Sequence, residues 1–149
     1  MKASVLFLTV FFVLLSAVVE AQEGSPCSAT KKVKEVPMES VTILWSSGDP
    51  DVFHNCILPY SAYSCEKHCW KDVTLIMWGP SVRLLSENVD LQVDLGELIS
   101  KGLKVKACEI AAQRYHVKNQ LERIGVEVKS VSDEVTQGLK GQVAHLITL

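Results

Sequence analysis

One cysteine in this sequence stands where a thiol could do chemistry. Cys108 follows a predicted strand at residues 103–107 and precedes a predicted helix that begins at Glu109. Free N–H groups and the dipole at the start of a helix favour a thiolate over a thiol. Because the thiolate is the reactive form, Cys108 is the candidate nucleophile. The alternative, a small apolar core residue, is the usual fate of a free cysteine and stays open.

The sequence has five cysteines, an odd count, which indicates at least one free or intermolecularly paired thiol outside the cytoplasm. Cys56 lies on a predicted apolar helical stripe, so core packing is one interpretation. Resolution of a persulfide or disulfide at Cys108 is the other. Cys27 lies in a polar stretch. Its thiol is expected either to be exposed to solvent or to pair with a cysteine of another chain. None of these spacings forms a Cys-x-x-Cys motif.

Cys65 and Cys69 are four residues apart and would share one helix face. With His68 they offer three metal ligands, but nothing supplies a fourth, so no metal site is predicted. Two alternatives remain for the pair. The first is a helix end that carries two thiols, and the second is a disulfide formed where the helix frays.

Several side chains are candidates to assist Cys108 or to line a ligand site. His54 lies early in the first predicted helix and could donate a proton at the same sheet edge, although it could equally face solvent. Arg114 could add positive charge from the helix that follows Cys108, as could His116. An apolar pocket could be walled by aromatic residues that could instead be core residues: Trp45, Phe53 and Trp78.

These side chains must be positioned by strands and helices that alternate from residue 41 onward. Five runs predict strands: 41–45, 73–78, 103–107, 126–129 and 143–148. Asp49 and Pro50 predict the start of the first helix, and Pro59 predicts a kink in it. The alternation predicts an α/β fold of three layers, a mostly parallel sheet of about five strands between helices. The third strand is expected near an edge because its lysines alternate.

Ligands of such sheets bind at the carboxyl ends of the strands, which is where Cys108 is expected. No glycine-rich dinucleotide fingerprint and no P-loop follows any predicted strand, so no cofactor is predicted. The net charge of −2 argues against nucleic acid and anionic membranes as partners.

The start of the chain has the pattern of a secretory signal peptide. Lys2 precedes a nearly unbroken apolar stretch, and small residues precede a cleavage site after Ala21. The expected organisation is a signal peptide at 1–21, a flexible tail at 22–40 and one domain at 41–149. Export to the periplasm of a bacterium follows, with no membrane attachment after cleavage. An uncleaved N-terminal anchor is the alternative.

The segment around Cys108, residues 104–117, resembles the cysteine segment of the DsrE/DsrF family. Residues 41–49, 75–85 and 121–128 resemble other parts of the same family in the same order. The resemblance implies a three-layer α/β domain that assembles into homo-trimers or hexamers. It also implies that Cys108 accepts a persulfide sulfur from a donor protein and passes it to an acceptor.

Three hypotheses follow from the sequence. The first is an exported sulfur carrier, sulfurtransferase-like in its chemistry, with Cys108 as the acceptor. The second is a non-catalytic oligomeric domain that binds a small ligand or a partner protein. The third is a thiol redox protein that uses Cys108 with Cys56, which the lack of a Cys-x-x-Cys motif disfavours.

Overall fold

The computed structural model describes residues 40–141 and 145–149, all within one unit of the chain, Glu35–Leu149. The expected signal peptide, residues 22–39 of the expected tail and Cys27 lie outside the described residues. The cleavage site and the tail therefore remain predictions. The first described strand begins at Val41, where the domain was expected to start.

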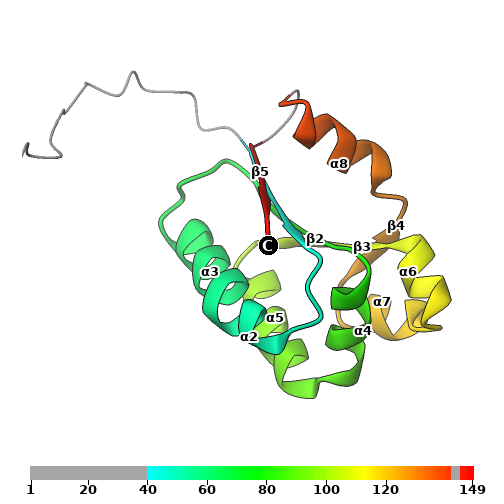
Figure 1. The fold of residues 1–149 in the computed structure, drawn as a ribbon. Helices are drawn as coiled ribbons and strands as arrows, with labels where there is room; N and C mark the ends of the chain where they lie inside the picture. Colours follow the sequence, from blue (N-terminus) through cyan, green and yellow to red (C-terminus); the bar gives the residue numbers. More distant parts are fainter. Residues whose placement is uncertain (1–39, 142–144) are drawn as a thin grey trace, which may run out of the picture. The chain divides into compact units, whose positions relative to one another are not determined.

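Five strands form a single sheet in the order β4-β3-β2-β1-β5, and all neighbouring strands run parallel. Helices flank the sheet on both sides, so the predicted three-layer α/β fold is confirmed (Figure 1). The strands are β1 (Val41–Trp45), β2 (Val73–Met77), β3 (Lys104–Cys108), β4 (Glu127–Lys129) and β5 (His145–Thr148).

The order of the strands decides which face each helix covers. From β1 to β4 the chain adds strands in one direction, so right-handed crossovers place the helices between them on one face. The return from β4 to β5 carries α8 over the opposite face (Figure 1). The helical segments are α2 (Pro50–Val52), η1 (Phe53–Ile57), α3 (Leu58–Glu66), α4 (Pro80–Glu87), α5 (Val89–Ser100), α6 (Glu109–Arg114), α7 (Lys118–Arg123) and α8 (Ser132–Leu139).

The core lies mainly between the sheet and the layer of helices that contains α3 and α5. Every residue of β1 and β2 is buried, as expected for apolar strands in the middle of a parallel sheet. The rings of Trp45 and Phe53 contact each other with centroids 5.1 Å apart, and both side chains are fully buried. α5 contributes a buried stripe of Leu91, Leu95 and Leu98.

The first helical segment departs from the predicted pattern. Asp49 caps it and Pro50 opens it, as predicted, but η1 is a π-helix in which the Leu58 N–H donates to the Phe53 carbonyl. This wider turn precedes Pro59, which lacks an N–H and disturbs the preceding turn. The buried positions become Phe53 and Ile57. Cys56 is exposed, so its interpretation as a core residue is wrong.

β3 lies one strand inside the sheet, between β2 and the edge strand β4. An open sheet edge is therefore not what accommodates the alternating lysines of β3. They project to the face that α8 covers, where Lys104 pairs with Asp72 and Lys106 pairs with Glu134. Polar side chains are thus accommodated on a strand with neighbours on both sides.

The two faces of α5 differ enough for a direct test of this packing. Leu95→Ala should lower the free energy of unfolding by about 2–5 kcal/mol, because it removes buried methyl groups and leaves a cavity. Val93, which is 58% exposed on the same helix, provides the control. Val93→Ala should change the stability by less than about 0.5 kcal/mol in urea unfolding. Equal losses in both variants would contradict the orientation of α5.

Candidate functional site

The carboxyl ends of β1, β2 and β3 lie side by side at one edge of the sheet. Trp45 is in register with Met77, and Met77 with Ala107, so the loops that follow these strands begin next to one another. This carboxyl edge comprises residues 46–49, 78–81 and 108–109. The arrangement expected for a ligand site in a parallel sheet is therefore present.

A buried hydroxyl ties two of these strand ends together. Ser81 Oγ donates to the Trp45 carbonyl at 2.7 Å and accepts from the Trp78 N–H at 3.0 Å. The neighbouring loop approaches so closely that a Cβ on Gly48 would lie 3.0 Å from Pro80 Cβ. The absence of a side chain at residue 48 therefore allows this contact between the loops that follow β1 and β2.

Cys108 occupies the position predicted from the sequence, but its side chain is buried. It is the last residue of β3 and the N-cap of α6, in extended conformation (φ −61°, ψ 117°). Its side chain is only 5% exposed. Strand alternation places it on the same face as Lys106, which is the face that α8 covers. The expectation of a sulfur open to a ligand is not met in this conformation.

Arg114 does not lie beside the thiol. It is the last residue of α6, while Cys108 precedes the first, so about 9 Å of helix axis separates their backbones at 1.5 Å per residue. The side chain of Arg114 is exposed. His116 follows the helix with a left-handed backbone, φ 59°, and is also exposed. The start of α6 instead carries Glu109, whose carboxylate lies 3.7 Å from Lys118 Nζ.

His54 and Cys56 also lie away from Cys108. His54 is exposed, and its Nδ1 lies 3.9 Å from the Asp94 carboxylate on α5, which agrees with the solvent-facing alternative. Cys56 is exposed on η1, a segment that packs on the sheet through Phe53. This segment and the side chain of Cys108 are on opposite faces of the sheet. The structure therefore does not bring these three candidates together.

The aromatic pocket considered from the sequence is not formed. Trp45 and Phe53 are packed in the core, as the alternative interpretation held. Trp78 is 41% exposed at the carboxyl end of β2. It is the one aromatic of the three that a ligand or partner could contact directly.

Cys65 lies in the last turn of α3, which ends at Glu66, whereas Cys69 lies beyond the helix end. The expectation that they share one helix face is therefore wrong, and both are free thiols. Burial raises the pKa of the Cys65 thiol, an effect that Lys101 opposes and Glu66 reinforces. Cys65 also lines a pocket of about 190 Å³, whereas Cys69 is exposed. No three His, Cys, Asp or Glu side chains are arranged to hold a metal ion within the described part of the chain.

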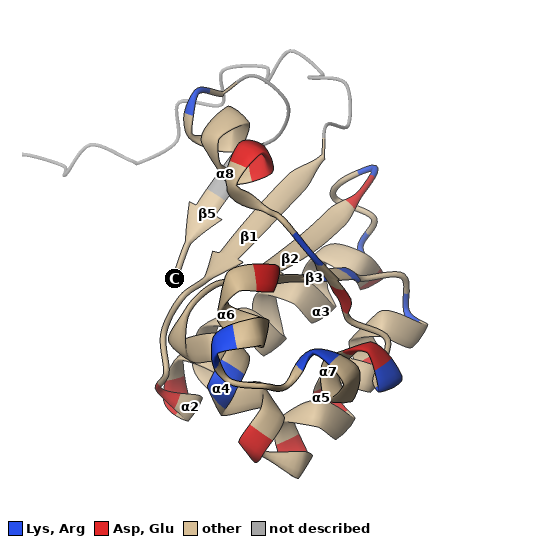
Figure 2. Cartoon of the chain, turned by 90° about the vertical axis from the view of Figure 1, so that its right-hand side faces the viewer, with Lys and Arg blue, Asp and Glu red and all other residues tan. Residues whose placement is uncertain are grey.

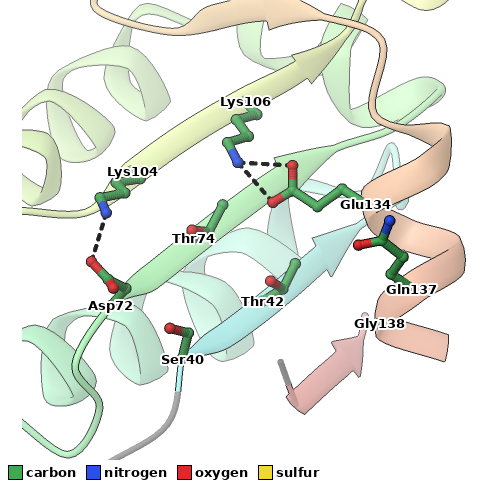
Figure 3. Close-up of a pocket in the computed structure, with 9 residues that line it drawn as sticks. All are labelled: Ser40, Thr42, Asp72, Thr74, Lys104, Lys106, Glu134, Gln137 and Gly138. Carbon is green, nitrogen blue, oxygen red and sulfur yellow. Dashed lines mark hydrogen bonds and ion pairs between the residues drawn. The ribbon is translucent and has the colours of Figure 1, made fainter. Parts of the chain in front are cut away.

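A second pocket was not anticipated from the sequence. It lies between the sheet and α8, has a volume of about 310 Å³, and is lined by polar side chains (Figure 3). The sequence has only local traces of it: one threonine in each of the apolar strands β1 and β2, and the alternating lysines of β3. We call it the α8 pocket, and its lining residues are Ser40, Thr42, Asp72, Thr74, Lys104, Lys106, Glu134, Gln137 and Gly138.

Charges are mixed over the surface. Basic and acidic positions are interspersed among the helices seen in Figure 2, in keeping with a net charge of −2. None of the helices that the structure describes has the length and apolar character needed to cross a membrane.

Solved structures of the same fold are known, whereas no family model and no curated protein matches the chain. A conserved protein of unknown function from Bacteroides thetaiotaomicron, BT1422, is 24% identical, with a TM-score of 0.70 over 74% of this chain and 95% of that one. The E. coli protein YchN is 16% identical, with a TM-score of 0.54 over 75% of this chain and 100% of that one. MTH1491 from Methanobacterium thermoautotrophicum, also of unknown function, is 18% identical, with a TM-score of 0.56 over 74% and 99%.

At these identities the likeness establishes the fold. The chain shares the fold of these three proteins. Two of the three are described as proteins of unknown function, so they carry no activity over to this chain.

The link between β1 and β2 can be tested through Ser81. Ser81→Ala should lower the free energy of unfolding by about 1–3 kcal/mol, because it removes a buried hydroxyl that bonds two backbone groups. Ser86 is the matched control, since its Oγ donates to the Arg83 carbonyl on the exposed side of the same helix, α4. Ser86→Ala should stay within about 0.5 kcal/mol of the unsubstituted chain in chemical denaturation.

The four described thiols should react with iodoacetamide in a defined order. Cys56 and Cys69 are exposed and should be alkylated first at pH 7.5. Cys65 should follow more slowly, because its raised pKa leaves less thiolate at that pH. Cys108 should react last because its side chain is buried. Peptide mapping at timed intervals measures the order, and early alkylation of Cys108 would show that its burial is wrong.

Proposed function

We propose that this chain is an exported sulfur carrier of the DsrE type, in which Cys108 accepts a persulfide sulfur. The observation that carries the proposal is the position of Cys108, at the carboxyl end of a parallel strand and at the N-cap of the helix that follows. The sequence around Cys108 resembles the sulfur-accepting segment of that family. Export and a homo-oligomeric assembly, a trimer or hexamer, belong to the same proposal.

The reaction is a thiol–persulfide exchange. The Cys108 thiolate attacks the outer sulfur of a donor persulfide, R–S–SH, and forms a new S–S bond. The donor's own S–S bond breaks, its electron pair stays on the donor sulfur, and that thiolate takes up a proton. Cys108 becomes a persulfide with no net oxidation. Attack by an acceptor thiolate on the outer sulfur then returns Cys108 to its thiolate.

The burial of Cys108 sets a condition on this exchange. A donor can reach the sulfur only when the chain at the junction of β3 and α6 opens locally. α6, which begins at this junction, is a six-residue helix whose N-cap provides no side-chain hydrogen bond. Short, uncapped helices open locally at low free-energy cost. In the closed state, the same burial would protect a bound persulfide from water and from unrelated thiols.

Exposed apolar side chains near Cys108 offer a surface for a donor or acceptor protein. Trp78 follows β2, the strand next to β3, and Ile110, which is 65% exposed, is the second residue of α6. A partner docked on Ile110 would contact the helix that begins beside Cys108.

Intact-mass spectrometry tests the proposal. The purified protein is treated with an inorganic persulfide donor and then briefly with a small thiol, which removes sulfur from exposed cysteines such as Cys56 and Cys69. It should keep one added sulfur atom, which peptide mapping places on the buried Cys108. Cys108→Ala should lose this gain. Cys56→Ala, which removes an exposed thiol, is the matched control and should retain it. The same gain in the Cys108→Ala protein, or none in any protein, would refute the carrier role.

The alternative, a binding domain without thiol chemistry, is favoured by one specific observation, the α8 pocket. The redox alternative has less support, because Cys56 is exposed on the side of the sheet opposite to Cys108.

A further inference from the structure

The α8 pocket begins with a polar row across the middle of the sheet. Thr42 is in register with Thr74, and Thr74 with Lys104, so three neighbouring strands present polar side chains side by side. Parallel strands covered on both faces are usually apolar throughout. Such a row on the central strands therefore needs polar partners.

α8 supplies the opposite wall of the pocket. Glu134, Gln137 and Gly138 lie three and four residues apart, which places them on one helix face, above the sheet (Figure 3). Lys106 Nζ lies 2.7 Å from one carboxylate oxygen of Glu134 and 2.8 Å from the other. The Lys106 side chain is 16% exposed, so this pair fixes α8 over β3 in a partly dry environment.

Two buried hydroxyl-bearing residues of the row have no partner of their own. Thr42 is 4% exposed and Thr74 is 8% exposed, and both side chains point from the sheet into the pocket (Figure 3). Neither hydroxyl hydrogen-bonds to any residue that the structure describes, and neither does the Gln137 amide. These groups face the open space of the pocket, where their hydrogen-bonding capacity is available to a ligand or water.

The charges of the pocket cancel in pairs. Lys104 Nζ bonds to Asp72 Oδ1 at 2.6 Å, and Lys106 bonds to Glu134. The hydrogen bond from Lys104 lowers the pKa of the Asp72 carboxyl, so Asp72 stays ionised at neutral pH. A charged ligand would find no unpaired counter-charge here. An uncharged ligand with several hydroxyls would find donors and acceptors on both walls, at Thr42 and Thr74 on the sheet and at Gln137 on α8, with apolar surface between them.

We infer that the α8 pocket is a binding site for a small, uncharged polyhydroxyl compound, a polyol or a monosaccharide. The volume of about 310 Å³ is at the lower end of the range for ligand pockets, which suits a molecule of that size. The Thr42 and Thr74 hydroxyls, each both donor and acceptor, hydrogen-bond the ligand's hydroxyls from the sheet, and Gln137 does so from α8. The paired carboxylates accept from its remaining O–H groups.

The site is separate from Cys108 and does not rest on the carrier role. It lies at the amino ends of the strands, since Ser40 and Asp72 directly precede β1 and β2. Loss of sulfur loading therefore leaves this inference standing, and failure to bind polyols leaves the carrier role standing.

Saturation-transfer NMR with the purified chain tests the site, with myo-inositol, glucose and glycerol as probes. At least one probe should bind, and the double variant Thr42→Val/Thr74→Val should weaken its binding at least about tenfold, because it removes two hydroxyls at nearly constant volume. Thr148→Val makes the same change on β5, outside the pocket, and should leave binding unchanged.

A second variant guards against a change in fold. Gln137 is exposed on α8, so Gln137→Met should keep the fold and also weaken binding severalfold. Phosphate and glycine serve as charged and zwitterionic probes, and both should fail to bind at the pocket. Three results would overturn the inference: no binding by any uncharged probe, equal binding in the Thr42/Thr74 variant, or tighter binding of phosphate or glycine.

Discussion

The return of the chain across the sheet is the constraint on which the rest of this structure depends. β1 to β4 are laid down in one direction, and right-handed crossovers place all their connecting helices on one face. The single connection from β4 to β5 passes over the other face and brings eight helical residues, α8. One face therefore has a thick helical cover, and the described cover of the other is a short helix.

This asymmetry explains why the two faces have different chemistry. The face under α3 and α5 is apolar along β1 and β2, and burial of its side chains supplies most of the stability. Under α8, Val131 and Val135 are buried, while the Lys106–Glu134 pair closes the space beside them. A partly buried ion pair adds little net stability because of its desolvation cost, but it fixes geometry. Here it sets the height of α8 above the polar row.

Much of this fold could be predicted from local sequence, and the exceptions have physical causes. The apolar runs of β1 and β2 and the capping residue Asp49 act over a few residues, so they could be recognised without the structure. The π-helical turn before Pro59 could not, because a kink, a break and a wider turn all relieve the missing N–H. The choice between them depends on how Phe53 and Ile57 pack on the sheet.

The candidate functional site also combines features that local sequence predicts with features that depend on contacts between distant segments. The end of β3 at Cys108 follows from local pattern, but the burial of its side chain depends on distant packing. The polar row could not be seen because Thr42, Thr74 and Lys104 come together only through the strand order. The distances between these residues along the sequence do not indicate the order of the strands in the sheet.

The thiol and the α8 pocket share one sheet face but depend on different helices. Lys104 and Cys108 are four residues apart on β3, about 13 Å at the rise of a strand. The thiol lies at the junction of β3 and α6, whereas the shape of the pocket depends on α8, which Glu134 attaches to Lys106. Two sites are coupled only through an element whose equilibrium both of them shift. Lys106 is the residue of β3 through which such coupling would pass, and its pairing with Glu134 holds it in one position.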